Sequence, residues 1–202
     1  MGYLEDDLVR LINVTKNITM NDYNNDIDLT TEHCKDLSLL ELGEQELMLS
    51  PSTYKVSILK SFMENRPRKF KTSNYYYSKD YLQTIFKKVV SVDYMVCCKD
   101  TVKVDLSKSL KSQGINDTYD VITNYGTSEH VGEFDEHKHN KINHQYIVFK
   151  SIHDALNKEG LMIHAVPCKW IRHGVYHYEP EFFENLAKAC GYKVLYLSLI
   201  HI

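Results

Sequence analysis

No stretch of the sequence is apolar over the length needed to cross a bilayer, so a membrane-spanning protein is not expected. Excess charge of one sign is also nearly absent, because the formal net charge is −3. This value gives no general electrostatic reason to bind nucleic acid or an anionic membrane. The first residues, Met1 to Asp7, are acidic, whereas a secretory signal is basic and then apolar. These absences favour a globular protein with no membrane partner and no secretory signal.

Cysteine is present, but not in a pattern that predicts disulfide bonds. The five cysteines are odd in number, and two adjacent ones could hardly bridge each other without strain. Reduced thiols are typical of the cytosol, so we expect a cytoplasmic protein in which all cysteines are free. They are Cys34, Cys97, Cys98, Cys168 and Cys190.

Length and periodicity predict one α/β domain that spans residues 1–202. The 202 residues suit a single domain with a sizeable core, and the sequence shows no internal repeat. Short apolar segments alternate with segments of helical periodicity, which predicts a doubly wound, mostly parallel sheet with helices on both faces. The expected strands are 38–42, 89–93, 101–105, 119–123, 161–166 and 192–199.

The expected helices begin with one at about 3–13, followed by a polar loop with at most one helical turn, 13–31. A strand–helix–strand step needs roughly thirty residues. The longer interval after the first strand therefore predicts an insertion at about 50–77. The remaining helices are expected around 81–86, at 142–156 with Gly160 as its stop, and from Pro180 to Gly191.

Polar residues or glycine stand where the first four strands end. In open α/β folds the ligand crevice lies at the carboxyl ends of the strands. There, Gly43 lets a ligand approach the backbone, and Asp93 is placed to accept hydrogen bonds from ribose hydroxyls. Asp105 ends the third strand and Asn124 follows the fourth. Each acid alone is equally consistent with a turn or a helix cap, but the ordered series of four favours a nucleotide crevice.

These strand ends resemble the successive nucleotide-binding motifs of class I S-adenosylmethionine-dependent methyltransferases, which are Rossmann-like. The segment Asn124–His130 resembles the motif after the fourth strand in one branch of that family. The helix end and strand that follow, Asn157–His164, resemble another of its segments. The resemblance covers about residues 37–197. The four motifs that carry it are Leu39–Gly43, Ser91–Asp93, Val104–Leu106 and Tyr119–Asn124.

The resemblance implies an S-adenosylmethionine cofactor and a role for each matching residue. Such sheets carry one further strand, so we expect the last strand to be missing here. The implied contacts are Glu41 and Gly43 with the methionine end, Asp93 with the ribose, Asp105 and Leu106 with the adenine, and Asn124 near the methyl group.

The implied reaction is methyl transfer to an oxygen or nitrogen of a small or medium-sized molecule. Attack on a sulfonium methyl is a single displacement, so most of the catalysis comes from alignment of the reacting atoms. An oxygen nucleophile also benefits from a base, and Glu129 and His130 are the candidates. An equally supported interpretation gives both residues a hydrogen bond that orders the loop.

The turn after the first strand departs from the family pattern. Gly43 is followed by Glu44, Gln45 and Glu46, where the family has several glycines. This departure favours an alternative, a non-catalytic module that keeps the fold and has lost normal cofactor binding. A nicotinamide-dependent oxidoreductase is disfavoured, because no Gly-x-Gly-x-x-Gly follows the first strand.

Two further groups of residues have a structural and a functional interpretation. His137, His139 and His144 approximate a metal site, but their spacing fits no standard pattern, so we expect surface histidines and no metal. His164 lies in an apolar strand and is expected to be hydrogen-bonded in the core. Basic and aromatic residues in 66–77 could bind nucleic acid, but the acidic balance of the chain favours a solvated loop.

Overall fold

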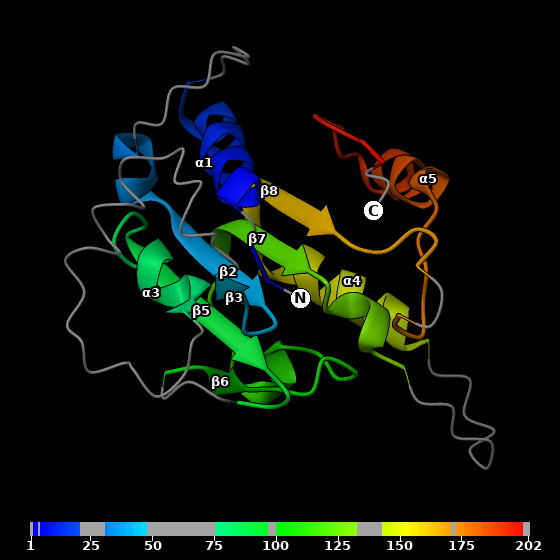
Figure 1. Ribbon diagram of the computed structural model, residues 1–202. Coiled ribbons are helices and arrows are strands. Elements are labelled where there is room, and N and C mark those ends of the chain that lie inside the picture. The colour runs from blue at the N-terminus through cyan, green and yellow to red at the C-terminus, as the bar shows by residue number, and fades with distance from the viewer. Residues whose placement is uncertain are drawn as a thin grey trace.

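The computed structural model describes residues 2–3, 5–20, 31–47, 76–96, 100–132, 143–170 and 173–199. Its centre is a five-stranded, all-parallel sheet in the order β6-β5-β2-β7-β8 (Figure 1). The chain therefore builds the sheet outward from β2 in both directions, which confirms the expected doubly wound fold. The strands are β2 (Ser38–Leu42), β5 (Lys88–Asp93), β6 (Val102–Lys103), β7 (Tyr119–Tyr125) and β8 (Leu156–Ala165).

Helices cover both faces of this sheet, because its central strands are apolar on both sides. In β2, Leu39 points into one core cluster and Leu40 into the other. The first cluster is closed by α1 (Glu5–Met20) and α3 (Ser78–Leu82), and the second by α4 (His144–Ala155). In Figure 1 the blue helix α1 and the yellow helix α4 accordingly lie on opposite sides of β7.

The first helix is longer than expected. It continues to Met20, although the residues after Asn13 were predicted to form a loop. Its buried stripe extends to Thr15, whose hydroxyl donates to the carbonyl of Ile12 at 2.7 Å and lies 3.0 Å from Nε2 of His33. A polar sequence stays helical when one face packs on the protein, and this tertiary contact overrides the local preference for a loop.

A second, small sheet flanks the expected insertion. It has the order β1-β3-β4, formed by β1 (Gly2–Tyr3), β3 (Glu46–Leu47) and β4 (Tyr76–Tyr77). Because β3 and β4 are antiparallel neighbours, the chain returns at residue 76 beside the point where it left at residue 47. The interval 48–75, with the basic residues of the expected insertion, lies outside the described residues. The main sheet is continuous across it, with Leu42 paired to Val92.

The last part of the chain differs most from the prediction. Helix α5 (Pro180–Cys190) ends at Gly191 as expected, but residues 192–199 form no strand, so that prediction was wrong. A strand needs a hydrogen-bonded neighbour, and the apolar pattern of a segment does not supply one. Gly160 does not stop a helix either: α4 ends at Ala155, and Gly160 lies within β8. No helix in the described ranges is both long and apolar enough to cross a bilayer.

Candidate functional site

The carboxyl edge of the sheet, where the parallel strands end, is where an open α/β fold binds its ligand. The switch point lies at β2, whose neighbours β5 and β7 continue in opposite directions through the sheet. Three turns therefore meet there. They contain Gly43 after β2, Asp93 at the end of β5, and Thr127 after β7.

The carboxylate of Asp93 links the turn after β2 to the turn after β5. Its Oδ2 accepts a 2.7 Å hydrogen bond from the amide of Glu44, and its Oδ1 accepts one of 2.8 Å from the amide of Met95. Each carboxylate oxygen keeps a further lone pair for a ligand. The two residues that follow, Tyr94 and Met95, are 66% and 75% exposed. The acid thus stands beside exposed apolar surface.

The space above Gly43 is filled by protein. Gly43 has φ of +78°, and a Cβ atom there would lie 2.1 Å from Oγ1 of Thr127 and 2.8 Å from Nε2 of Gln45. Oγ1 of Thr127 is 2.9 Å from the carbonyl oxygen of Leu42 and accepts a 3.3 Å hydrogen bond from Gln45. The other amide atom of Gln45, Oε1, is buried and has no hydrogen-bond partner. The turn after β2 therefore has one buried acceptor without a partner, Oε1 of Gln45, beside a glycine that is covered by the side chain of Thr127.

Glu41 does not reach the carboxyl edge. Its side chain is fully buried beneath α3, where it accepts hydrogen bonds from the hydroxyls of Ser78 and Ser91. Burial raises the pKa of Glu41 from 4.5 to about 7. The Ser78 hydroxyl also lies 3.1 Å from the carbonyl oxygen of Gln45, so Glu41 and Gln45 share its single proton.

Asp105 and Leu106 stabilise a turn. Oδ1 of Asp105 accepts hydrogen bonds from the amide of Ser107 at 3.0 Å and from its hydroxyl at 2.6 Å. Burial by itself would raise the pKa of Asp105, but the bonds from Ser107 and Lys108 hold it below its ordinary value. Leu106 is buried in the second core cluster. The carboxylate of Asp105 is thus engaged by Ser107 and Lys108, and the side chain of Leu106 is part of the core.

Asn124 is buried and holds the end of β7. Its Oδ1 accepts from the amide of Ser128 at 3.1 Å, and its Nδ2 donates to the Ser128 hydroxyl at 2.8 Å and to Nδ1 of His164 at 3.1 Å. His164 is thus hydrogen-bonded inside the fold, as predicted. Because Nδ1 accepts, the proton of the neutral ring is on Nε2. Burial lowers the pKa of His164 to about 4.

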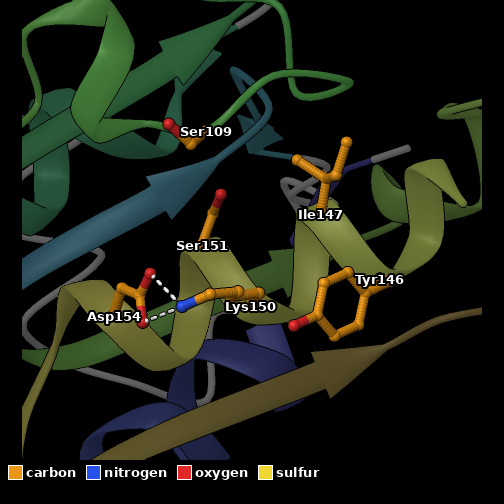
Figure 2. Close-up of a pocket in the computed structure, with 6 residues that line it drawn as sticks. All are labelled: Ser109, Tyr146, Ile147, Lys150, Ser151 and Asp154. Carbon is orange, nitrogen blue, oxygen red and sulfur yellow. Dashed lines mark hydrogen bonds and ion pairs between the residues drawn. The ribbon is translucent and has the colours of Figure 1, made fainter. Parts of the chain in front are cut away.

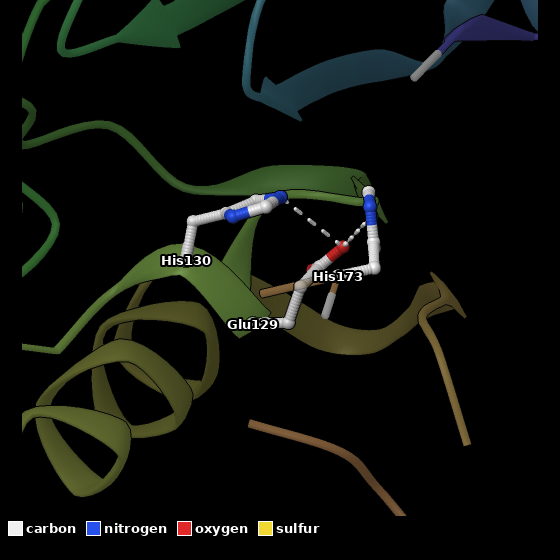
Figure 3. Close-up of side chains that lie close together, drawn as sticks. All are labelled: Glu129, His130 and His173. Atoms are coloured by element: carbon white, nitrogen blue, oxygen red, sulfur yellow. Dashed lines mark ion pairs between the residues drawn. The ribbon is translucent and has the colours of Figure 1, made fainter. Parts of the chain in front are cut away.

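The structure brings Glu129 and His130 together with His173, a residue that the sequence pattern did not single out (Figure 3). Glu129 and His130 lie in a 3₁₀ turn, Ser128–His130, directly after β7. Oε1 of Glu129 is 3.5 Å from Nε2 of His173 and 3.7 Å from Nε2 of His130. We call these three residues the Glu-His-His cluster. It lies just beyond the carboxyl edge of the sheet.

The segment after His173 fixes the position of Glu129 by hydrogen bonds and close packing. The carbonyl of Glu129 accepts hydrogen bonds from the amides of Val175 at 2.7 Å and Tyr176 at 3.0 Å. A Cβ atom on Gly174, which has φ of +73°, would lie 2.7 Å from Cγ of Glu129. Burial raises the pKa of this carboxyl group. The close fit of Gly174 against Glu129 connects His173 to the site, and no sequence pattern contains this contact.

Other chemistry-bearing residues lie apart from this cluster. His144 begins α4, whereas His137 and His139 lie outside the described residues. Cys34, Cys168 and Cys190 are free thiols, as expected, and the other two cysteines also lie outside the described part.

A small pocket of about 180 Å³ lies on the outer side of α4, where Lys150 and Asp154 form a 2.7 Å ion pair (Figure 2). Ser109 and Ser151 also line it. Its volume is below the range of roughly 300–1,000 Å³ that is usual for ligand sites. None of the residues expected at the site lines it, so it does not compete with the carboxyl edge.

The chain matches no family model, and comparisons with curated proteins and with solved structures also found no match. Function is therefore inferred from the fold, from the turns around Gly43 and Asp93, and from the Glu-His-His cluster.

Proposed function

We propose that this protein transfers a methyl group from S-adenosylmethionine to an oxygen or nitrogen of a small or medium-sized molecule. The observation that carries the proposal is the position of Asp93. It ends the strand next to β2, at the switch point, with an exposed aromatic side chain directly after it. A carboxylate in this place suits ribose hydroxyls, and the exposed ring of Tyr94 suits a base.

The residues present fit the two halves of the cofactor unequally. The adenosine half has Asp93 and the surface of Tyr94 and Met95. For the methionine half, the buried and unpartnered Oε1 of Gln45 suits an ammonium group. Thr127 fills the space above Gly43, so its side chain must rotate away before the cofactor can approach that backbone. Bound there, the cofactor would supply an electrophilic methyl group on a sulfonium.

The Glu-His-His cluster provides the acid–base groups for the acceptor. Burial holds the pKa of Glu129 above its ordinary value, which brings a carboxylate base closer to neutral pH. His130 is half exposed and faces solvent beside it. We therefore assign proton removal from the acceptor to Glu129 or His130. The free thiols and the absence of a membrane-spanning helix among the described residues are compatible with the cytoplasmic location that forms part of this proposal.

One observation favours the alternative, a binding module without catalysis. The contact of Thr127 with Gly43 closes the approach to the backbone, and Glu41 and Asn124 are occupied by internal hydrogen bonds. A fold that has lost its cofactor would show such closure. The two functions differ in cofactor affinity, which is measurable directly.

The test is calorimetric titration of the purified chain with S-adenosylmethionine and with its demethylated product. We expect both to bind, and Asp93→Asn to weaken binding at least about tenfold, since a lost charged hydrogen bond is worth about 1.5–3 kcal/mol. Asp154→Asn is the matched control, because that exposed acid pairs with Lys150 on α4. Circular dichroism verifies that each variant folds. Absence of binding to the unmodified chain would overturn the proposal in favour of the binding module.

A further inference from the structure

The Glu-His-His cluster has the spacing of a metal site. One ligand atom from each of Glu129, His130 and His173 lies within 4.8 Å of the other two. Around a tetrahedral zinc ion with bonds of about 2.0 Å, neighbouring ligand atoms are roughly 3.3 Å apart. The carboxylate–imidazole distances of 3.5 and 3.7 Å are already close to that value. The remaining distance, between the ligand atoms of the two histidines, is within 4.8 Å.

Buried atoms in the cluster also lack the partners that a folded protein normally supplies. Glu129 is 0% exposed, and neither of its carboxylate oxygens accepts a hydrogen bond. Nε2 of His173 is likewise buried and without a hydrogen bond. Leaving such groups unsatisfied costs free energy. A cation between them would satisfy both at once.

The ring of His173 is held in position for this role. The indole of Trp170 stacks on it, with ring centroids 4.1 Å apart and an angle of 16° between the planes. The ring of His130 meets it in a T-shaped arrangement, with ring centroids 5.1 Å apart. Preorganised ligand side chains are a general feature of metal sites.

We propose that Glu129, His130 and His173 bind a divalent transition-metal ion of the zinc class. Imidazole with one carboxylate suits zinc, iron, cobalt or manganese better than calcium or magnesium, which prefer oxygen ligands. The side chain of His130 is 50% exposed, so the ion keeps a coordination position open to water or to a substrate oxygen. This site does not depend on the proposed methyl transfer, and while the ion is bound Glu129 and His130 are its ligands and not free bases.

The test is metal binding by the full chain after removal of metals with a chelator, without any methyl donor present. Calorimetry with zinc should give one strong site per chain, and cobalt should produce visible absorption bands as a coordinated ion. Glu129→Gln and His173→Ala should each lower zinc affinity at least about tenfold, since even outer partners of a metal site contribute 10–100-fold. At the same zinc concentration, zinc should raise the unfolding temperature of the unmodified chain more than that of either variant.

The controls separate this site from other histidines and from a folding defect. His153→Ala removes an exposed imidazole on α4, outside the cluster, and should leave zinc binding unchanged. Glu129→Gln keeps the shape of the side chain and removes a buried charge, so the variant should fold. Lack of zinc binding by the unmodified chain contradicts the proposal. So does full affinity in both Glu129→Gln and His173→Ala, which would assign the metal to other residues.

Discussion

Oγ1 of Thr127 lies 2.1 Å from the position that a Cβ atom on Gly43 would occupy. The two residues follow neighbouring parallel strands, β2 and β7, and the hydroxyl of Thr127 is 2.9 Å from the carbonyl oxygen of Leu42. The turns that leave these strands are therefore interlocked at the switch point of the sheet. Glycine is needed at position 43 for two reasons, its φ of +78° and this contact.

Gly43→Ala should destabilise the protein by about 2–4 kcal/mol. Strain from the positive φ contributes about 1 kcal/mol, and overpacking against Thr127 adds about 1–3 kcal/mol. Gly114→Ala is the matched control, because Gly114 has φ of +90° with nothing within 4 Å of the added Cβ. Urea denaturation measures both. Equal losses in the two variants would show that the contact with Thr127 contributes nothing.

Thr127→Ala provides a second check on the same contact. It removes the two Thr127 atoms, Oγ1 and Cγ2, that a Cβ on Gly43 would meet, and leaves the contact with Nε2 of Gln45 at 2.8 Å. In a double-mutant cycle, the loss caused by Gly43→Ala should shrink by about 1 kcal/mol or more when Thr127 is alanine. Effects that add within about 0.5 kcal/mol would contradict the interlocked turns.

Glu41 should make stability fall as pH rises. Its folded pKa of about 7 lies above its ordinary value of 4.5, so the folded state holds the proton more tightly. The stabilisation is complete below pH 4.5 and is lost as pH rises through 7, with an upper limit of roughly 3 kcal/mol. Glu41→Gln mimics the protonated side chain and should remove this loss. Denaturant unfolding from pH 4.5 to 8 measures it, and unchanged pH dependence in the variant would contradict the buried, neutral Glu41.

His164 should make stability fall as pH falls, which is the opposite of the effect of Glu41. Its folded pKa of about 4 lies below the ordinary 6.5, so the fold favours the neutral ring. The stabilisation is complete above pH 6.5 and is lost as pH falls through 4, again by up to roughly 3 kcal/mol. His164→Phe removes the titration in a place already lined by Phe149 and Phe183, and should flatten the acid side of the stability curve.

The pH-dependent contributions of Glu41 and His164 to stability partly cancel between pH 4.5 and 6.5. Removing either group should therefore expose the contribution of the other. Glu41→Gln should steepen the loss of stability on acidification, and His164→Phe should turn it toward a gain. The exposed His153 is the control for the second change, since His153→Ala should leave the acid side unaltered. Matching curves for His164→Phe and His153→Ala would contradict a neutral His164 in the folded state.

The strands were predictable where the apolar pattern is continuous. Ser38–Leu42 forms β2 with the expected bounds, because both of its faces are buried. Residues 192–199 have a similarly apolar pattern and form no strand. Helix α1 continues past Asn13 because Thr15 packs against His33, far along the chain. Local composition predicts a tendency, and distant partners decide whether it is realised.

The candidate site was predictable only in part. Glu129 and His130 follow one strand and were expected to lie together, whereas His173 joins them from a segment beyond β8. Asp93 lies at the switch point as its position at a strand end predicted. The sequence could not show that Glu41 turns beneath α3, or that Thr127 covers Gly43. These features depend on which strands are neighbours in the sheet.

An α/β chain with polar residues at successive strand ends follows from the sequence, because hydrophobic periodicity and turn residues act over a few positions. Which of those residues are exposed at the carboxyl edge, and which hydrogen-bond one another inside the fold, depends on the three-dimensional arrangement of the strands. The folded chain places the buried carboxylate of Glu129, whose oxygens have no hydrogen-bond partner, within 3.7 Å of the imidazole nitrogens of His130 and His173. The physical reason is that burial and partnership are set by strand order and by long-range contacts, which no local pattern contains.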